Sequence, residues 1–312
     1  MAQRDLTPVI ALAKRLRAAL QYVYYGDPAT VEAVVATALA GGHLLILGPV
    51  GIGKTTLAKA LAYAMGGTFK RVQATNETLP SDVLGYAIYT RDGGRHVVKG
   101  PIFANVVLID EINRMPPRSL SALIEAMQEK RVTIEGEEHP LPEPHLVIAT
   151  ANLQELGLAQ IPLAVLDRFT TSIYVERPDP TLEKVVVAEA SDIETRLEAL
   201  KKQPVTSPAE AAAATKALRA VKLEDRVASY IVELVEETRK ATNAPLSVRA
   251  SIHVAQLAKA FAALEGRTYV IPDDVKRAFH YALPHRIAIK LDPQLYKNSP
   301  LKDILQKVPA PW

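Results

Sequence analysis

The chain has 312 residues, a length that fits one large domain or two smaller ones. Apolar residues make up 48% and charged residues 23%, the profile of an ordinary soluble globular protein with material for a packed core. The net charge is only +3, no basic run exceeds two residues, and there is no cysteine, which argues against a dedicated nucleic-acid binder and excludes disulfides, thiolate metal sites and cysteine nucleophiles.

The first elements along the chain are predicted to be two helices. Thr7-Pro8 and Asp27-Pro28 are helix-start signals, and Gly41-Gly42 ends the second helix. The apolar face of the first helix consists of Val9, Leu12, Leu16 and Leu20. The charged N-terminal segment does not resemble a signal peptide, and glycines and a proline interrupt the uncharged stretch at 33–53. We therefore expect a cytoplasmic protein without membrane insertion.

Five short runs rich in Val, Ile and Leu are predicted to be strands. They are His43–Leu47, Phe69–Val72, Val106–Ile109, Leu146–Ala149 and Ser172–Val175. Helical patterns such as 55–65 and 119–128 lie between most of them. Strands that alternate with helices predict an α/β fold, in which a parallel sheet is covered on both faces.

Two insertions and a change of character complete the predicted organisation. Turn residues at Asp92-Gly93-Gly94 and at Glu135-Gly136 lie between β-rich arms and predict two hairpins. From residue 181 to about 283 the pattern is helical, with an interruption at 201–208. We therefore expect an α/β nucleotide-binding domain over 1–177 and an all-α lid domain over 178–312, whose tail from Pro284 is not assigned to an element.

The stretch "GPVGIGKTT" has the spacing G-x-x-x-x-G-K-[ST] after an apolar strand and before a helix. Glycines let backbone N–H groups wrap a phosphate chain, and the next helix adds the positive end of its dipole. Lys54 would reach the β- and γ-phosphates and Thr55 would ligate Mg²⁺. The predicted nucleotide-binding residues are Gly48, Pro49, Val50, Gly51, Ile52, Gly53, Lys54, Thr55 and Thr56. The alternative is a plain glycine-rich turn.

Two other strands end in polar residues suited to phosphoryl chemistry. "VVLIDE" ends in Asp110, which would hold Mg²⁺, and Glu111, which would polarise the attacking water. Without the phosphate loop, such a pair is more often a helix cap. "VIATAN" ends in Asn152, whose amide would orient the water, although spacing alone favours an ordinary turn asparagine.

The chain resembles the MoxR family of AAA+ ATPases. The resemblance covers most of the chain and is densest in "LAGGHLLILGPVGIGKTTLAKALA", "LPSDVLG", the block from "GPIFANVVLIDE" to "VIATAN", and "VLDRF". It implies a strand order of 5-1-4-3-2 and makes Asn152 the first sensor residue. "PLSVRAS" resembles the second sensor motif, so the resemblance makes Arg249 a γ-phosphate reporter, acting either within its own subunit or across the interface.

The resemblance also implies a role for Arg168 in "PLAVLDRF". It would be an arginine finger that reaches the nucleotide of the next subunit, where a guanidinium stabilises charge on the transferring γ-phosphoryl group. Spacing alone favours a surface ion pair, for example with Asp167. Arg114 is a second candidate for an inter-subunit contact. The family's "VGQ"-like element near the adenine is replaced here by "YYGDP", and no proline follows Asn152.

The function implied by the resemblance is ATP hydrolysis with Mg²⁺ in a homo-oligomeric ring, a hexamer, that remodels or matures a protein client. The client would carry, in many such systems, a von Willebrand factor A domain. Three alternatives stay open: a nucleic-acid motor of the same clade, the ATPase subunit of a metal chelatase, and a nucleotide-gated scaffold without turnover. The mixed charges of the two predicted hairpins argue against the first.

Overall fold

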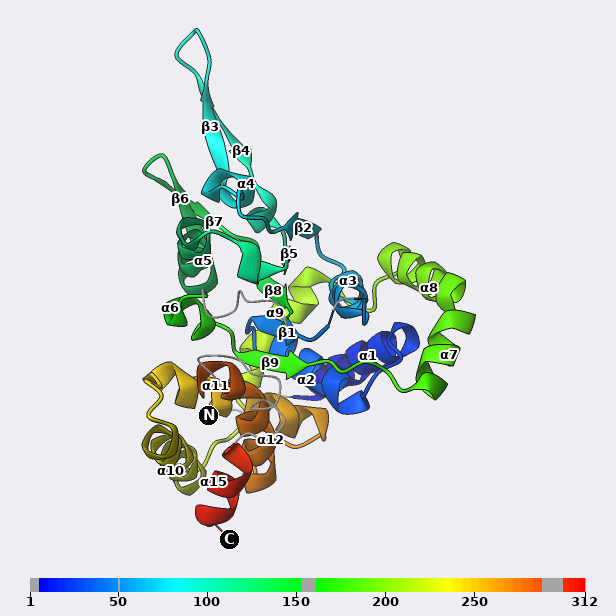
Figure 1. Cartoon of the computed structure of the whole chain (residues 1–312), viewed down its shortest axis with the longest axis vertical. Helices are drawn as coiled ribbons and strands as arrows, with labels where there is room; N and C mark the ends of the chain where they lie inside the picture. Colours follow the sequence, from blue (N-terminus) through cyan, green and yellow to red (C-terminus); the bar gives the residue numbers. More distant parts are fainter. Residues whose placement is uncertain (1–5, 50, 153–160, 288–299, 312) are drawn as a thin grey trace.

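The computed structural model describes residues 6–49, 51–152, 161–287 and 300–311. Its centre is a five-stranded, all-parallel sheet, with two hairpins projecting at one end of the molecule and a helical bundle at the other (Figure 1). The strands are β1 (Leu44–Leu47), β2 (Phe69–Gln73), β5 (Val106–Asp110), β8 (Leu146–Ala151) and β9 (Thr171–Tyr174). Their order, β2-β5-β8-β1-β9, is the order implied by the resemblance, read from the other edge.

The alternation of side chains along each strand divides the core into two hydrophobic clusters. Leu44 and Ile46 of β1 belong to one cluster, whereas Leu45 and Leu47 belong to the other. All four of these side chains are buried, as expected for a parallel sheet with both faces covered. The predicted α/β fold is therefore confirmed.

Helices from both halves of the chain share the first cluster. They are α1 (Thr7–Val23), α2 (Pro28–Leu39), α3 (Lys54–Ala64), α8 (Ala190–Lys202), α9 (Pro208–Leu218), α10 (Asp225–Thr242), α11 (Val248–Leu264) and α12 (Pro272–Ala282). Of the two predicted start signals, Asp27-Pro28 acts as expected: Asp27 caps α2 by accepting a hydrogen bond of 3.0 Å from the Ala29 N–H, and Pro28 follows at the first helical position. Thr7 is instead the first residue of α1, after Leu6 at the N-cap position. The C-terminal helices thus pack directly on the α/β core, with no solvent layer between them.

The opposite face of the sheet carries shorter elements. They are α4 (Pro80–Leu84), the 3₁₀ turns Pro101–Phe103 and Ile112–Arg114, α5 (Pro117–Glu129) and α6 (Leu163–Leu166). Both predicted hairpins are present, as β3 (Gly85–Tyr89) with β4 (Arg95–Lys99) and as β6 (Arg131–Ile134) with β7 (Glu137–Pro140). Glu135 and Gly136 have φ values of 49° and 82°, and positive φ at both central residues is what a two-residue turn of type I′ requires.

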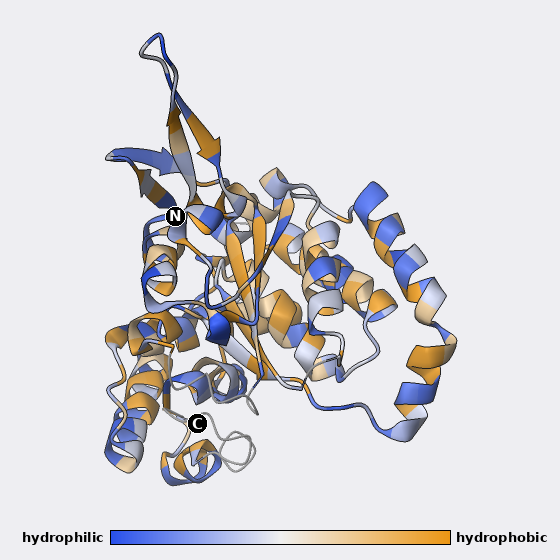
Figure 2. Ribbon diagram, turned by 45° about the horizontal axis from the view of Figure 1, so that its top comes forward, coloured by the Kyte–Doolittle hydropathy of each residue, from blue (hydrophilic) through white to orange (hydrophobic). Residues whose placement is uncertain are grey.

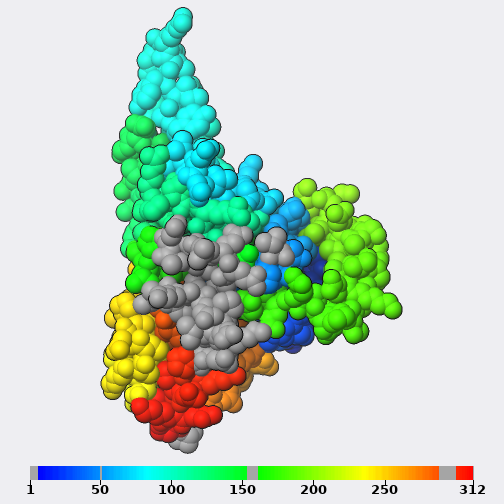
Figure 3. Space-filling view, viewed as in Figure 1, coloured from blue at the N-terminus to red at the C-terminus, as the bar shows by residue number. Residues whose placement is uncertain are grey.

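The remaining helices lie at the periphery. α7 (Pro180–Ala188) and α8 form a lobe at the side of the molecule (Figures 1 and 3). Two short helices, α13 (Pro284–Ile287) and α15 (Leu301–Lys307), lie in the tail that the sequence pattern left unassigned. Within the described ranges, every helix is too short or too polar to cross a bilayer.

Candidate active site

The phosphate loop joins β1 to α3 in a conformation that only glycines adopt readily. Gly48, Gly51 and Gly53 have φ values of 144°, 81° and 86°, in the range that disfavours residues with a Cβ atom. A Cβ atom on Gly48 would also lie 2.3 Å from the carbonyl oxygen of Val175. The loop therefore has the backbone freedom that a phosphate cradle needs. Val50, also predicted to bind nucleotide, is outside the described residues.

Lys54 begins α3 and reaches back over the loop. Its Nζ donates hydrogen bonds of 2.6 Å to the carbonyl oxygens of both Gly48 and Pro49. The ammonium group thus lies where the phosphates of a bound nucleotide would be cradled. Thr55 follows it, and the Thr55 Oγ1 lies 3.5 Å from the Asp110 Oδ2 at the end of β5.

Asp110 is buried and held from three sides. Besides Thr55, its carboxylate accepts a short hydrogen bond from the Thr150 hydroxyl of β8 and bonds of 3.1 and 2.6 Å from Nε and a terminal nitrogen of Arg71 on β2. A hydroxyl and a carboxylate beside a phosphate cradle form the all-oxygen set that Mg²⁺ prefers. Thr55 and Asp110 therefore fit the magnesium ion that the sequence predicts. The contribution of Arg71 was not predicted.

Glu111 lies next to Asp110, with a left-handed backbone (φ 59°). Its N–H donates to the Thr150 hydroxyl at 3.0 Å, and its Oε2 accepts from Gln73 Nε2 at 3.0 Å. Arg114 forms an ion pair of 3.3 Å with the same oxygen. The side chain is thereby oriented at the carboxyl edge of the sheet, where a general base for water would be needed.

Asn152 directly follows β8, which lies between β1 and β5 in the sheet. Because the carboxyl ends of parallel strands meet at one edge, Asn152 belongs to the same row as the phosphate loop and the Asp110-Glu111 pair. Residues 153–160, which begin without the proline expected directly after Asn152, are outside the described residues.

A pocket of about 600 Å³ opens beside the phosphate loop. The loop contributes Gly51 to Gly53 and Thr56 to the pocket, and "YYGDP" contributes residues 24–27. Burial, and then the nearby charge of Asp27, raise the pKa of Tyr24 to about 12, so its hydroxyl keeps its proton at neutral pH. "YYGDP" thus lines the pocket that adjoins the phosphate loop.

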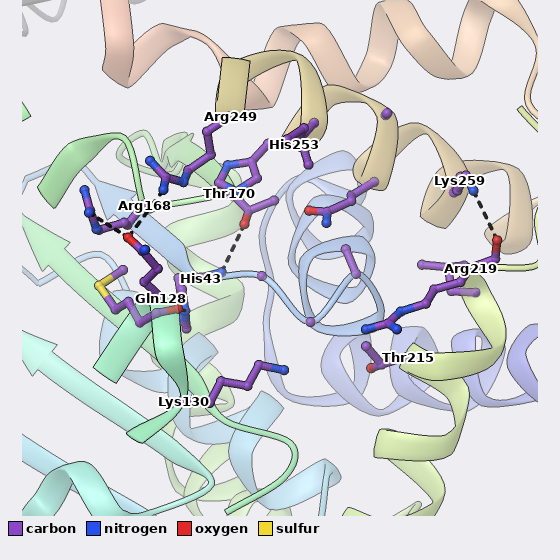
Figure 4. A pocket seen from close by; sticks show the side chains of 18 of the residues that line it. His43, Gln128, Lys130, Arg168, Thr170, Thr215, Arg219, Arg249, His253 and Lys259 are labelled. Carbon is purple, nitrogen blue, oxygen red and sulfur yellow. Dashed lines mark hydrogen bonds between the residues drawn. The ribbon is translucent and has the colours of Figure 1, made fainter. Parts of the chain in front are cut away.

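Arg168 and Arg249 do not lie at this pocket. They lie beside each other on a second pocket of about 600 Å³, between the sheet edge, α9 and α11 (Figure 4). Its described lining includes Lys130, Arg168, Arg219, Arg249 and Lys259 but neither aspartate nor glutamate. We call it the cationic pocket. We call the pocket beside the phosphate loop the nucleotide pocket. Among the described residues, the two pockets share no lining residue.

The two arginines are tied to one glutamine. A terminal nitrogen of Arg168 donates to Gln128 Oε1 at 2.8 Å, and Arg249 approaches the same oxygen at 3.4 Å. Arg168 also donates a short hydrogen bond to the Ala164 carbonyl. Burial and then the neighbouring Arg249 charge lower the pKa of Arg168 from its usual high value. Two like charges held side by side favour a shared anion between them.

Asp167 connects α6 to the helical bundle, a contact that the sequence did not reveal. It accepts hydrogen bonds from Ser247 (2.8 Å), Arg249 (2.7 Å) and Arg286 (3.0 Å). Burial alone would raise its pKa, but the Arg286 charge and these hydrogen bonds hold the pKa below the ordinary value. Arg286 is itself buried and also donates to the carbonyl of Phe169 at 2.8 Å. Arg168 and Arg249 therefore belong to one rigid unit.

We expect Asp167→Ala to destabilise the protein by about 3–5 kcal/mol, because it leaves the buried Arg286 without its carboxylate. Urea unfolding followed by circular dichroism measures this loss. Glu233→Ala, which removes an exposed carboxylate from the middle of α10, is the control and should change stability by less than about 0.5 kcal/mol. Equal effects of the two substitutions would contradict the assigned role of Asp167.

Comparison with known protein families gives two matches. The model described as "ATPase family associated with various cellular activities (AAA)" matches residues 43–171, which include the phosphate loop, the Asp110-Glu111 pair and Arg168. The model described as "AAA lid domain" matches residues 236–308, which include Arg249.

Full-length relatives agree with these matches. The chain is 36% identical to the uncharacterized protein YeaC of Bacillus subtilis, over 92% of this chain and 89% of YeaC. It is 32% identical to the chaperone MoxR1 of Mycobacterium tuberculosis, over 93% and 80% of the two chains. The crystal structure of a protein from Cytophaga hutchinsonii, described as a candidate ATPase, superposes with a TM-score of 0.83 at 32% identity and covers 97% of this chain and 96% of its own.

Proposed function

The chain belongs to the MoxR family of AAA+ ATPases, and on that premise we propose that it hydrolyses ATP in a ring whose subunits complete one another's active sites. The observation that carries this proposal is the separation of the two pockets. The phosphate loop and the acidic pair lie at one pocket, while Arg168 and Arg249 lie together at another. The two arginines thus act in trans, on the nucleotide of the next subunit.

Within one subunit, the residues at the carboxyl ends of the strands have different roles. Lys54 and the loop glycines bind the phosphates, and Thr55 with Asp110 would hold Mg²⁺, which when bound would neutralise phosphate charge. Glu111, oriented by Gln73, accepts the proton of the attacking water. Asn152 orients that water without competing for the metal.

The neighbouring subunit supplies the remaining charge. Arg168 and Arg249, both positioned through α6 and Asp167, meet the γ-phosphoryl group as its negative charge spreads in the transition state. Such a contact is heterologous, because different surfaces of identical chains meet, and a heterologous contact gives a ring when its rotation closes. By analogy with the family the ring is a hexamer.

The work of the ring is, in our proposal, the remodelling of a protein partner in the cytoplasm. One relative is named as a chaperone. The projecting hairpins β3–β4 and β6–β7 are the parts placed to pass motion to a client, of which a von Willebrand factor A domain protein is one candidate (Figure 1). In β6–β7, Glu137 pairs with Arg95 and Glu138 pairs with Arg131, so the hairpin surface has mixed charge rather than the concentrated basic face of a nucleic-acid motor, which disfavours that alternative.

Dilution tests the proposal. When the particle is diluted until single chains dominate, as seen by analytical ultracentrifugation, ATP turnover per chain should fall by about 10³-fold or more, because each site loses its trans arginines. Nucleotide binding, followed with a fluorescent ATP analogue, should persist because the cradle lies within one chain. A turnover per chain that stays constant through dissociation would overturn the proposal.

A further inference from the structure

Helix α7 has no buried residue. Val187 and Val185 are 72% and 39% exposed, and the intervening Val186 and the preceding Leu182 are only half-buried. Figure 2 shows an orange, hydrophobic stretch of ribbon on the lobe that α7 and α8 form beside the core. A helix with this many apolar residues, none of them fully buried in its own subunit, leaves part of its apolar surface without the packing that such helices normally have.

The need for a partner also follows from helix energetics. α7 has only nine residues, which is too short for stability in water without packing. Its three consecutive valines are β-branched, and such residues lower helix propensity. The Asp179 side chain caps the helix through the Leu182 N–H at 2.8 Å, but one cap contributes only about 1 kcal/mol. Contact with another surface would supply the missing stabilisation.

A second exposed apolar patch lies at the start of α11. Val248 is 71% and Ile252 is 49% exposed, and their spacing of four residues puts them on one face of the helix. Arg249 lies between them in sequence, and Ile252 lines the cationic pocket. This patch therefore lies beside the cationic pocket, whose arginines act on the neighbouring subunit in the proposed function.

The apolar residues of α7 lie beside the nucleotide pocket. Leu182 and Val186 line the nucleotide pocket from the side of α7. The charges around the two pockets are complementary: the described lining of the nucleotide pocket has Asp27, Glu176 and Asp179 against Arg177 alone, whereas the cationic pocket is lined by lysines and arginines. The surface around the nucleotide pocket and the surface around the cationic pocket thus carry opposite charge, and each has exposed apolar residues beside it.

We propose that Val187 of α7 in one copy packs against Val248 and Ile252 of α11 in the next copy. This inference rests on the trans arrangement proposed above, because the same contact brings Arg249 toward the nucleotide of the neighbour. It adds a coupling between nucleotide and interface. Since α7 presents Val186 to the nucleotide pocket and Val187 to solvent, a shift of the nucleotide moves the helix on which the neighbour is seated.

Cross-linking tests the contact directly, and the absence of native cysteine makes the test clean. One batch of protein carries Val187→Cys and a second batch carries Val248→Cys. Mixed with ATP and a short bismaleimide, they should give a covalent dimer at least about tenfold faster than either batch alone. Val232→Cys, at a site on α10 that is 50% exposed, replaces Val248→Cys in the matched control. Equal rates for the two mixtures would overturn the inference.

A second variant links the contact to assembly. Val187→Glu should raise the dissociation constant of the particle by about tenfold or more, because it puts a carboxylate against an apolar patch, whereas Val232→Glu should leave the constant unchanged. The outcomes distinguish this interface from the proposed function. If turnover falls on dilution but both α7 experiments are negative, the trans site stands and this interface is wrong. If turnover survives dilution, the trans site is wrong.

Discussion

Glu111→Gln should bind ATP with close to the native affinity while turnover falls by about 10²–10⁴-fold, the usual contribution of a general base. The amide keeps the size and the hydrogen-bonding capacity of the side chain, so the contacts with Gln73 and Arg114 can be partly retained. What is lost is the acceptor for the proton of the water. Single-turnover hydrolysis and a binding titration separate the two effects.

Glu135→Gln is a matched control, since it neutralises a carboxylate on the β6–β7 turn, far from the sheet edge, and should leave turnover unchanged (Figure 1). Normal turnover in Glu111→Gln would remove Glu111 from the reaction. The stalled variant has a further use: held with ATP, it should retain a client long enough for its capture and identification.

The fold could be predicted largely because local patterns agree with one another. Apolar runs of strand length alternate with amphipathic stretches, and start signals such as Thr7-Pro8 and Asp27-Pro28 lie at the helix starts that the structure shows. Strand ends shifted by one or two residues, as where Thr171 rather than Ser172 begins β9, because ladder pairing and not composition sets them.

The chemical groups at the sheet edge were also predictable, because each follows an apolar strand within a motif. Their supporting partners were not. Arg71, Gln73 and Thr150 contact Asp110 or Glu111 only because β2, β5 and β8 are neighbours in the sheet, and sequence separation hides that adjacency. Arg71 is an exposed residue of the edge strand β2, a place where charged side chains are common, so the sequence does not mark it as a partner of Asp110.

The helical bundle shows the same limit. Its helices were predicted from their periodicity, but the sequence left open on which side of the core they pack. Asp167 helps to fix that side, because its carboxylate binds Arg249 of α11 and Arg286 of α13. The two arginines are 82 and 119 residues away in sequence, so no local pattern reveals the contact. The position of Arg249 beside Arg168 therefore follows from tertiary packing and could not be predicted from the sequence. Because the two arginines lie together and away from the nucleotide pocket, we propose the same trans role for both.

Arg168→Ala should lower turnover by about 10³–10⁵-fold, the range for an arginine finger supplied in trans. ATP affinity should change little, because Arg168 lies outside the nucleotide pocket of its own chain. Arg168→Lys should recover only a small part of the loss, since an ammonium cannot match the planar fork of a guanidinium on phosphoryl oxygens. Lys130→Ala, at another cation of the same pocket, is the control for a general loss of charge.

Mixing decides between a trans and a cis role. Lys54→Ala removes the cradle but keeps the arginines, and Arg168→Ala does the reverse, so each should be inactive alone. In mixed particles some interfaces pair an intact cradle with an intact finger, and about a quarter of the native turnover should return at equal proportions if subunits mix at random and sites act independently. A mixture with no more turnover than its components would mean that Arg168 serves its own chain, and the composite site would have to be abandoned.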